Sequence, residues 1–108
     1  MTLKKNDLTQ ATQLIRQAFD LSPTEWLPEG TEFAEEELLI KLEQLVSYLL
    51  DKDLEKLLQV LYRIDADERK VKLILANESP ERLSRTMAEL ILERQKMKLK
   101  YRNLYRGS

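Results

Sequence analysis

Apolar residues recur every three or four positions along most of this chain, which is the spacing of one face of an α-helix. A first helix is predicted from about Asp7 to Asp20. It stops near Leu21, because Pro23 disfavours the helical conformation for the residue before it. Ser22 to Gly30 is the one clear loop signal. The buried face of this first helix would hold Leu8, Ala11, Ile15, Ala18 and Phe19.

A second and more apolar helix is predicted to begin after Thr31, which can cap it. Four glutamates fall in its first two turns, where the positive end of the helix dipole favours acids. Its apolar stripe is wide, so we expect this helix to lie in the middle of the fold. The predicted core positions are Phe33, Leu38, Leu42, Leu45, Val46 and Leu49.

Two shorter helices should follow. The acids of Asp51 to Asp53 interrupt the pattern, and Asp65 with Glu68 has the D-x-x-E form of a capping box that would begin the second of them. Val71, Ile74 and Leu75 are its apolar positions. The buried side of the helix before it would hold Leu54, Leu57, Leu58, Leu61 and Ile64.

The last helix should be the longest, because Ser79 followed by Pro80 is a cap with proline at the first helical position and no later breaker occurs before Gly107. Its apolar residues alternate spacings of four and three, which is a heptad seam. Arg94 fills the one polar place in that seam. We expect the last turns to extend past the bundle, which would leave Met97, Tyr101 and Leu104 as an exposed apolar strip. The other seam positions are Leu83, Met87, Leu90, Met97, Tyr101 and Leu104.

These elements predict an all-α fold, a compact bundle of four to five helices with a long C-terminal helix. The chain has only two glycines and three prolines, so helix formers dominate it. Its 108 residues suit one domain over residues 1–108, with flexible ends at residues 1–6 and 103–108.

The absence of cysteine and histidine narrows the chemistry. It removes thiolate and imidazole metal ligands, disulfides and the usual general base near neutral pH. Asp51, Asp53 and Glu55 resemble the start of a calcium loop, but Lys56 replaces the required glycine and Tyr62 the closing glutamate. We therefore expect no enzyme activity, no metal and no cofactor. No signal peptide or membrane-spanning stretch is visible, which predicts a cytoplasmic protein.

Charge is segregated although the net charge is only -1. Residues 93–106 carry six basic side chains and one acid, whereas residues 20–43 carry eight acids and one base. Such polarity predicts either an electrostatic clamp within the domain or a basic surface offered to a partner. For the basic helix, four interpretations stay open: a solvated face, a nucleic-acid surface, a membrane-surface helix and a protein-binding or dimerisation helix.

We favour the protein-binding interpretation among the functional ones. A non-catalytic interaction or regulatory module is predicted, which could self-associate through its last helix by setting the acidic Glu35 to Glu37 edge of one copy against the basic helix of another. Packing of the first helix across the seam is the alternative. Nucleic-acid binding through the basic helix is the second candidate function. Trp26 could dock a partner or cover the core. The candidate interaction surface consists of Arg94, Met97, Lys98, Tyr101, Arg102, Leu104 and Tyr105.

Between Glu37 and Arg102 the chain resembles a family of small bacterial helical proteins to which we can attach no activity. The resemblance implies a bacterial cytosolic origin. It also suggests a polar cluster between the end of the third helix and residues 93–95 of the last, unless Arg63 only neutralises carbonyls at the end of its own helix. The residues that carry it are Leu61-Tyr62-Arg63-Ile64-Asp65, Asp67-Glu68, Lys70-Val71 and Ala88-Glu89-Leu90-Ile91-Leu92-Glu93-Arg94-Gln95.

Overall fold

The fold is all-α, as predicted. The computed structural model describes residues 5–20 and 34–105, and the regular elements within these ranges are five helices, without a strand. The predicted loop Ser22 to Gly30 with Trp26, the predicted cap Thr31 and the predicted core position Phe33 lie outside the described residues. The helices are α1 (Lys5–Phe19), α2 (Glu35–Lys52), α3 (Leu54–Arg63), α4 (Glu68–Asn77) and the long C-terminal helix α5 (Pro80–Tyr105).

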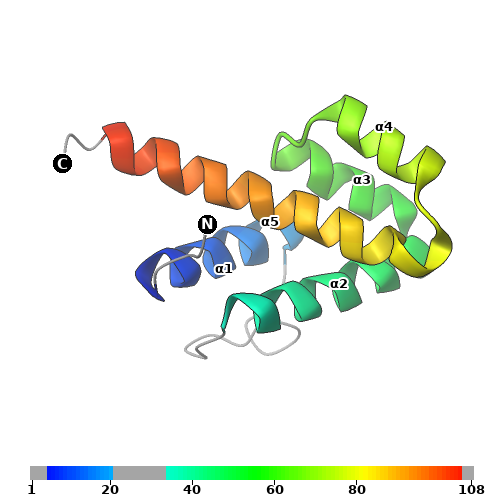
Figure 1. Ribbon diagram of the computed structural model, residues 1–108, viewed down its shortest axis with the longest axis horizontal. Helices are drawn as coiled ribbons and strands as arrows, with labels where there is room; N and C mark the ends of the chain where they lie inside the picture. The colour runs from blue at the N-terminus through cyan, green and yellow to red at the C-terminus, as the bar shows by residue number, and fades with distance from the viewer. Residues whose placement is uncertain (1–4, 21–33, 106–108) are drawn as a thin grey trace.

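Helix α5 holds the central place in the bundle (Figure 1). It packs against α2, α1 and α4, whereas α3 packs against α2 and α1. The prediction placed α2 in the middle. Helix α2 contacts both α3 and α5, but α5, with 26 residues, contacts three helices: α1, α2 and α4.

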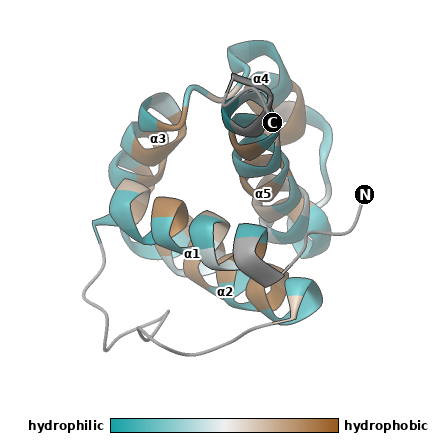
Figure 2. Cartoon of the chain, turned by 90° about the vertical axis from the view of Figure 1, so that its left-hand side faces the viewer, coloured by the Kyte–Doolittle hydropathy of each residue, from teal (hydrophilic) through white to brown (hydrophobic). Residues whose placement is uncertain are grey.

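The core is one apolar cluster to which all five helices contribute. Hydrophobic and hydrophilic positions alternate along the helices (Figure 2). The positions predicted for α1 and α2 are confirmed: the described ones are buried, except Leu8, which is partly buried against the cluster. The fully buried large side chains include Ile15, Phe19, Leu38, Leu42, Leu57, Ile64, Met87, Ile91 and Leu99.

The predicted core face of α3 is wrong at two positions. Leu54 and Leu58 are exposed, and Val60 is buried in their place beside Leu57 and Leu61. The reason is that this ten-residue helix is apolar on two sides, and only one side can face α2 and α1. In α4, similarly, Val71 is buried and Ile74 partly so, but Leu75 is exposed.

Two predicted helix starts also differ. Helix α2 begins at Glu35 rather than after Thr31, and Glu37 Oε1 accepts a hydrogen bond from the Ala34 backbone N at 3.4 Å. Helix α4 is capped by Asp67 and not by Asp65: Asp67 Oδ1 accepts from the backbone N–H groups of Arg69 and Lys70. Asp65 instead adopts a left-handed backbone with φ of 60°, which a short polar side chain tolerates.

The seam predicted for α5 is rotated in its second half. Met87 is buried, and Met97 and Tyr101 are exposed as expected. The cause differs from the expected one, because α5 is still packed at this level: Gln95 and Leu99, on its other side, are buried. The predicted seam and the face that is buried both follow the heptad spacing, so the position of the neighbouring helices decides which of the two faces the core. The full buried set on α5 is Met87, Ala88, Ile91, Leu92, Gln95 and Leu99.

Gln95 is a polar residue in this core. Its side chain is 1 % exposed, and neither Oε1 nor Nε2 has a hydrogen-bond partner. A buried amide without partners costs about 1 to 3 kcal/mol. Residue 95 therefore opposes stability where α5 passes through the core.

Replacing Leu49 with alanine should lower the free energy of unfolding by about 2 to 5 kcal/mol, because it opens a cavity in the core. Leu58→Ala, on the outer side of α3, should cost less than about 1 kcal/mol. Urea denaturation of both variants compares a buried leucine of α2 with an exposed leucine of α3. Equal losses would contradict the burial described above.

Gln95→Leu should raise the free energy of unfolding by about 1 kcal/mol, because it removes the unpaired amide and keeps a similar volume. Gln44→Leu, at an exposed position of α2, is the matched control and should change stability by less than about 0.5 kcal/mol. The two residue types have similar helix propensity, so the comparison isolates burial. A destabilised Gln95→Leu protein would show that the amide is satisfied.

Candidate functional site

Part of the segregated charge forms a clamp between α2 and α5. Arg85 donates a hydrogen bond to Glu36 Oε1 at 2.8 Å and another to Glu43 Oε2 at 3.4 Å. The hydrogen bond to Glu36 is the main reason that the pKa of Arg85 is raised. Further along α5, Lys96 Nζ forms an ion pair with Glu35 Oε1. Lys96 and Glu35 belong to the two charged segments of the prediction, whereas Arg85 lies outside residues 93–106 and was not part of it.

This clamp engages the acids that the dimer prediction assigned to a second copy. Glu35 is paired with Lys96, Glu36 with Arg85, and Glu37 with the Ala34 backbone N. A neighbouring chain would have to compete with contacts already made within the protein. The two-fold pair stays a prediction, and in it these acids would have to exchange the partners they have here.

Arg94 fastens α5 to the turn after α3. Its Nε donates to the Ile64 carbonyl oxygen at 3.1 Å, and one terminal nitrogen lies 3.3 Å from Asp65 Oδ2. The carboxylate of Asp65 is largely exposed, so the carbonyl bond contributes more to holding the turn than the ion pair does. Asp65 and Arg94 are in contact, as predicted for the polar cluster. Arg94 holds the turn after α3 against α5 and is therefore not a free cation of the surface.

Arg63 links a different pair of elements from the one expected. Its Nη1 donates to the Ala18 carbonyl oxygen at 3.2 Å, so it caps the C-terminal end of α1 and not that of its own helix α3. A cation at this end is favoured by the helix dipole. The bond joins residues that are 45 positions apart, which is why the local sequence gave no signal for it.

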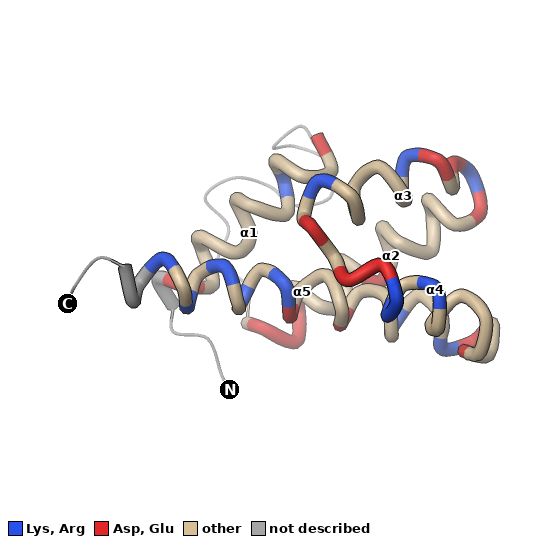
Figure 3. Tube along the Cα trace, turned by 90° about the horizontal axis from the view of Figure 1, so that it is seen from above, with Lys and Arg blue, Asp and Glu red and all other residues tan. Residues whose placement is uncertain are grey.

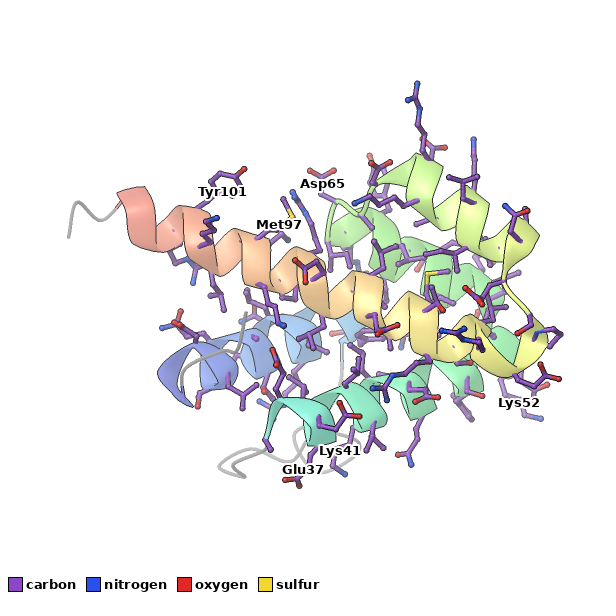
Figure 4. The ribbon with its side chains drawn as sticks, viewed as in Figure 1. Glu37, Lys41, Lys52, Asp65, Met97 and Tyr101 are labelled. Carbon is purple, nitrogen blue, oxygen red and sulfur yellow. The ribbon has the colours of Figure 1, made fainter. Side chains whose placement is uncertain are left out.

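The outward part of the candidate surface is a strip on α5, called here the α5 strip. It consists of the exposed residues Met97, Tyr101 and Arg102 and the partly buried Lys98. Met97 is 38 % and Tyr101 52 % exposed. Both project from the side of α5 that faces the turn with Asp65, and away from α1 and α2 (Figure 4). Basic positions recur along the same half of the helix (Figure 3).

Helix α1 does pack against α5, as the alternative to an open seam required. It lies beside the other face, where the chain buries Gln95 and Leu99, so none of the described helices covers the strip (Figure 1). Leu104 and Tyr105 belong to α5, but their side chains lie outside the described residues.

A groove of about 340 Å³ adjoins the α5 strip. It lies between the turn after α3, the start of α4 and the middle of α5. Met97 belongs to both the groove and the strip, which makes the two surfaces continuous. The sequence offered no signal for the groove, because three separate elements form it. Its lining residues are Asp65, Ala66, Asp67, Lys70, Leu90, Glu93, Arg94 and Met97.

Lys98 is the perturbed cation of the strip. Its pKa is lowered, first by partial burial of the ammonium group and then by repulsion from Arg94 and Arg102, with Asp65 opposing the shift. The positive charge of Lys98 is therefore less stable on the folded protein than in water. An anionic group placed beside Lys98 would stabilise it.

The described residues contain no group of three or more acids that could hold a metal ion. Within the same part of the chain no helix is both long and apolar enough to cross a membrane. Searches against protein families, curated proteins and solved structures give no match. The function must therefore be argued from the surface of this chain alone.

Replacing Lys98 with methionine should stabilise the protein at neutral pH. The folded pKa of Lys98 lies below its ordinary value of 10.5, so the folded state binds this proton more weakly than the unfolded state. The charged Lys98 therefore lowers the free energy of unfolding by its full amount at low pH. This loss disappears as the pH rises from the folded pKa toward 10.5. The advantage of Lys98→Met should shrink over that window.

Denaturant titrations of wild type and variant at a series of pH values measure this difference directly. Lys100→Met, at an exposed position of the same helix, is the matched control and should show a smaller effect. An advantage of Lys98→Met that stayed constant through alkaline pH would contradict the assignment.

Proposed function

We propose that this protein is a cytoplasmic, non-catalytic interaction module and that a partner protein docks on the α5 strip. The observation that supports this most directly is the exposure of Met97 and Tyr101 on an uncovered face of the central helix. Apolar side chains of this size on a small domain usually mark an interaction site when they are contiguous.

The composition of the strip is that of a protein interface. Tyrosine, methionine and arginine are enriched where proteins meet, and the strip has one of each in addition to Lys98. Tyr101 is the natural anchor, since aromatic residues at the centre of an interface often contribute most of the binding energy. The groove beyond Met97 lengthens the surface along α5.

Charge complementarity indicates the kind of partner. Lys98, Lys100 and Arg102 form no ion pair within the described part of the chain, whereas Lys96 and Arg94 do. An amphipathic helix with acidic residues beside its apolar face would neutralise these three cations and cover Met97 and Tyr101. We commit to such an acidic helical segment of another protein as the occupant.

Two other occupants fit less well. Pairing the α5 strip with itself would bring the cations of two copies together, and the acids of α2 are already engaged. A nucleic acid would find cations and a tyrosine for stacking, but the adjoining groove presents the carboxylates of Asp65, Asp67 and Glu93 to its phosphates. Both remain as outcomes of the experiment.

Tyr101→Glu should weaken partner binding without unfolding the protein, because the side chain is half exposed. Proteins that co-purify with the wild type from native cells would be expressed, purified and titrated against both forms. We expect the variant to bind at least about 30-fold more weakly, which corresponds to an interface anchor. Leu73→Glu, an exposed apolar position on α4, should bind as wild type does.

The same titrations separate the alternatives. Binding of generic DNA or RNA that weakens steeply with salt and requires Lys98 and Arg102 would favour the nucleic-acid function instead. A purified partner that binds Tyr101→Glu and wild type equally would remove the α5 strip from the interaction.

A further inference from the structure

A second apolar surface lies on the outer side of α3. Leu54, Leu58 and Tyr62 recur every four residues and are 47, 44 and 87 % exposed. They form one row, because this spacing places side chains above one another on a helix. Helix α3 packs on α2 and α1 with its opposite side, so the row faces outward. It shares no residue with the α5 strip.

The residues next to this row carry an ordered set of charges. Glu55, Gln59 and Arg63 each follow one member of the row and are exposed, so they form its polar edge. Read along the helix, that edge is negative, neutral and positive. Glu55 has no ion-pair partner among the residues that the structure describes.

An edge with this order of charges is complementary to itself when two copies run antiparallel. A two-fold axis at Leu58 would place Leu58 against Leu58 of the second copy and Leu54 against Tyr62. Rotation about that axis keeps both polar edges on the same side of the pair. Glu55 of each copy would then lie beside Arg63 of the other, and the two Gln59 amides would meet.

We propose that two copies of this chain associate through α3, antiparallel about a two-fold axis at Leu58. A hollow of about 490 Å³ lined by Glu55, Leu58, Gln59, Tyr62 and Arg63 receives the apolar row of the second copy. The contact is isologous, so it closes at a dimer rather than growing into a fibre. This proposal does not depend on the partner of the α5 strip.

Arg63 is able to serve both this contact and the one it already makes. Its Nη1 donates to the Ala18 carbonyl oxygen, and a guanidinium has five N–H donors in all. The remaining donors are free to bind Glu55 of the second copy. The interface consists of one pair of ten-residue helices, so it is small, and we expect a concentration-dependent monomer–dimer equilibrium.

The decisive experiment mixes two charge variants. In Glu55→Arg both edge charges are positive, and in Arg63→Glu both are negative, so each variant alone should be monomeric where the wild type dimerises. Mixed together, they restore both opposite-charge pairs and should form a heterodimer in sedimentation-velocity experiments. A monomeric wild type at millimolar concentration, or a mixture that stays monomeric beside a dimeric wild type, overturns the proposal.

Arg63→Glu also loses the bond to α1, so a second measurement keeps the test independent of its folding. The natural chain has no cysteine, and Leu58→Cys places a single thiol on the proposed axis. We expect its disulfide-linked dimer to form about tenfold or more faster than that of Leu73→Cys, an exposed control on α4. Equal rates overturn the proposal. Tyr101→Glu should leave the Leu58→Cys rate unchanged, which separates this contact from the α5 strip.

Discussion

The packing of α2 along α5 is the contact on which the rest of this fold depends. Both helices bury an apolar face there, and Ala88 on α5 is small enough to be fully enclosed. Arg85 and Lys96 then bind acids of α2 at two points along the contact, so the ion pairs fix how α5 is turned about its axis as well as where it lies. Burial supplies most of the stability, because such partly exposed pairs contribute little each.

That rotation of α5 determines which of its residues remain on the surface. With Ile91, Leu92, Gln95 and Leu99 turned inward, Met97 and Tyr101 necessarily project to the other side. Arg94 lies between the two sides and is used to hold the turn after α3. The α5 strip is thus a consequence of the clamp, and a change that rotated α5 would alter the candidate site without touching its residues.

The sequence was sufficient to predict the fold class and most helices, because their periodicity is local. It could not choose the buried face of α5, since a seam through Arg94 and Met97 has more apolar residues than one through Gln95 and Leu99. Burial of the Gln95 amide is unfavourable by itself and occurs because α2 and α1 pack on that side. Neighbouring helices also decide which of the two apolar sides of α3 is buried, so the sequence alone predicted both sides as one core face. Of the candidate site, the exposure of Met97 and Tyr101 was predicted. The groove and the hydrogen bond from Arg63 to the end of α1 were not predicted, because each joins segments that are far apart in the sequence.

The two exposed apolar surfaces differ in a way that suggests different partners. The charges of the α5 strip are all positive, so it repels its own copy and requires a foreign acidic segment. The edge of α3 carries charges of both signs in an order that complements itself. Helices α3 and α5 lie apart, on the left and on the right of Figure 2, and the row on α3 shares no residue with the α5 strip. A dimer built through α3 would therefore leave both α5 strips free, and a partner with two acidic helices could bind both at a higher effective concentration.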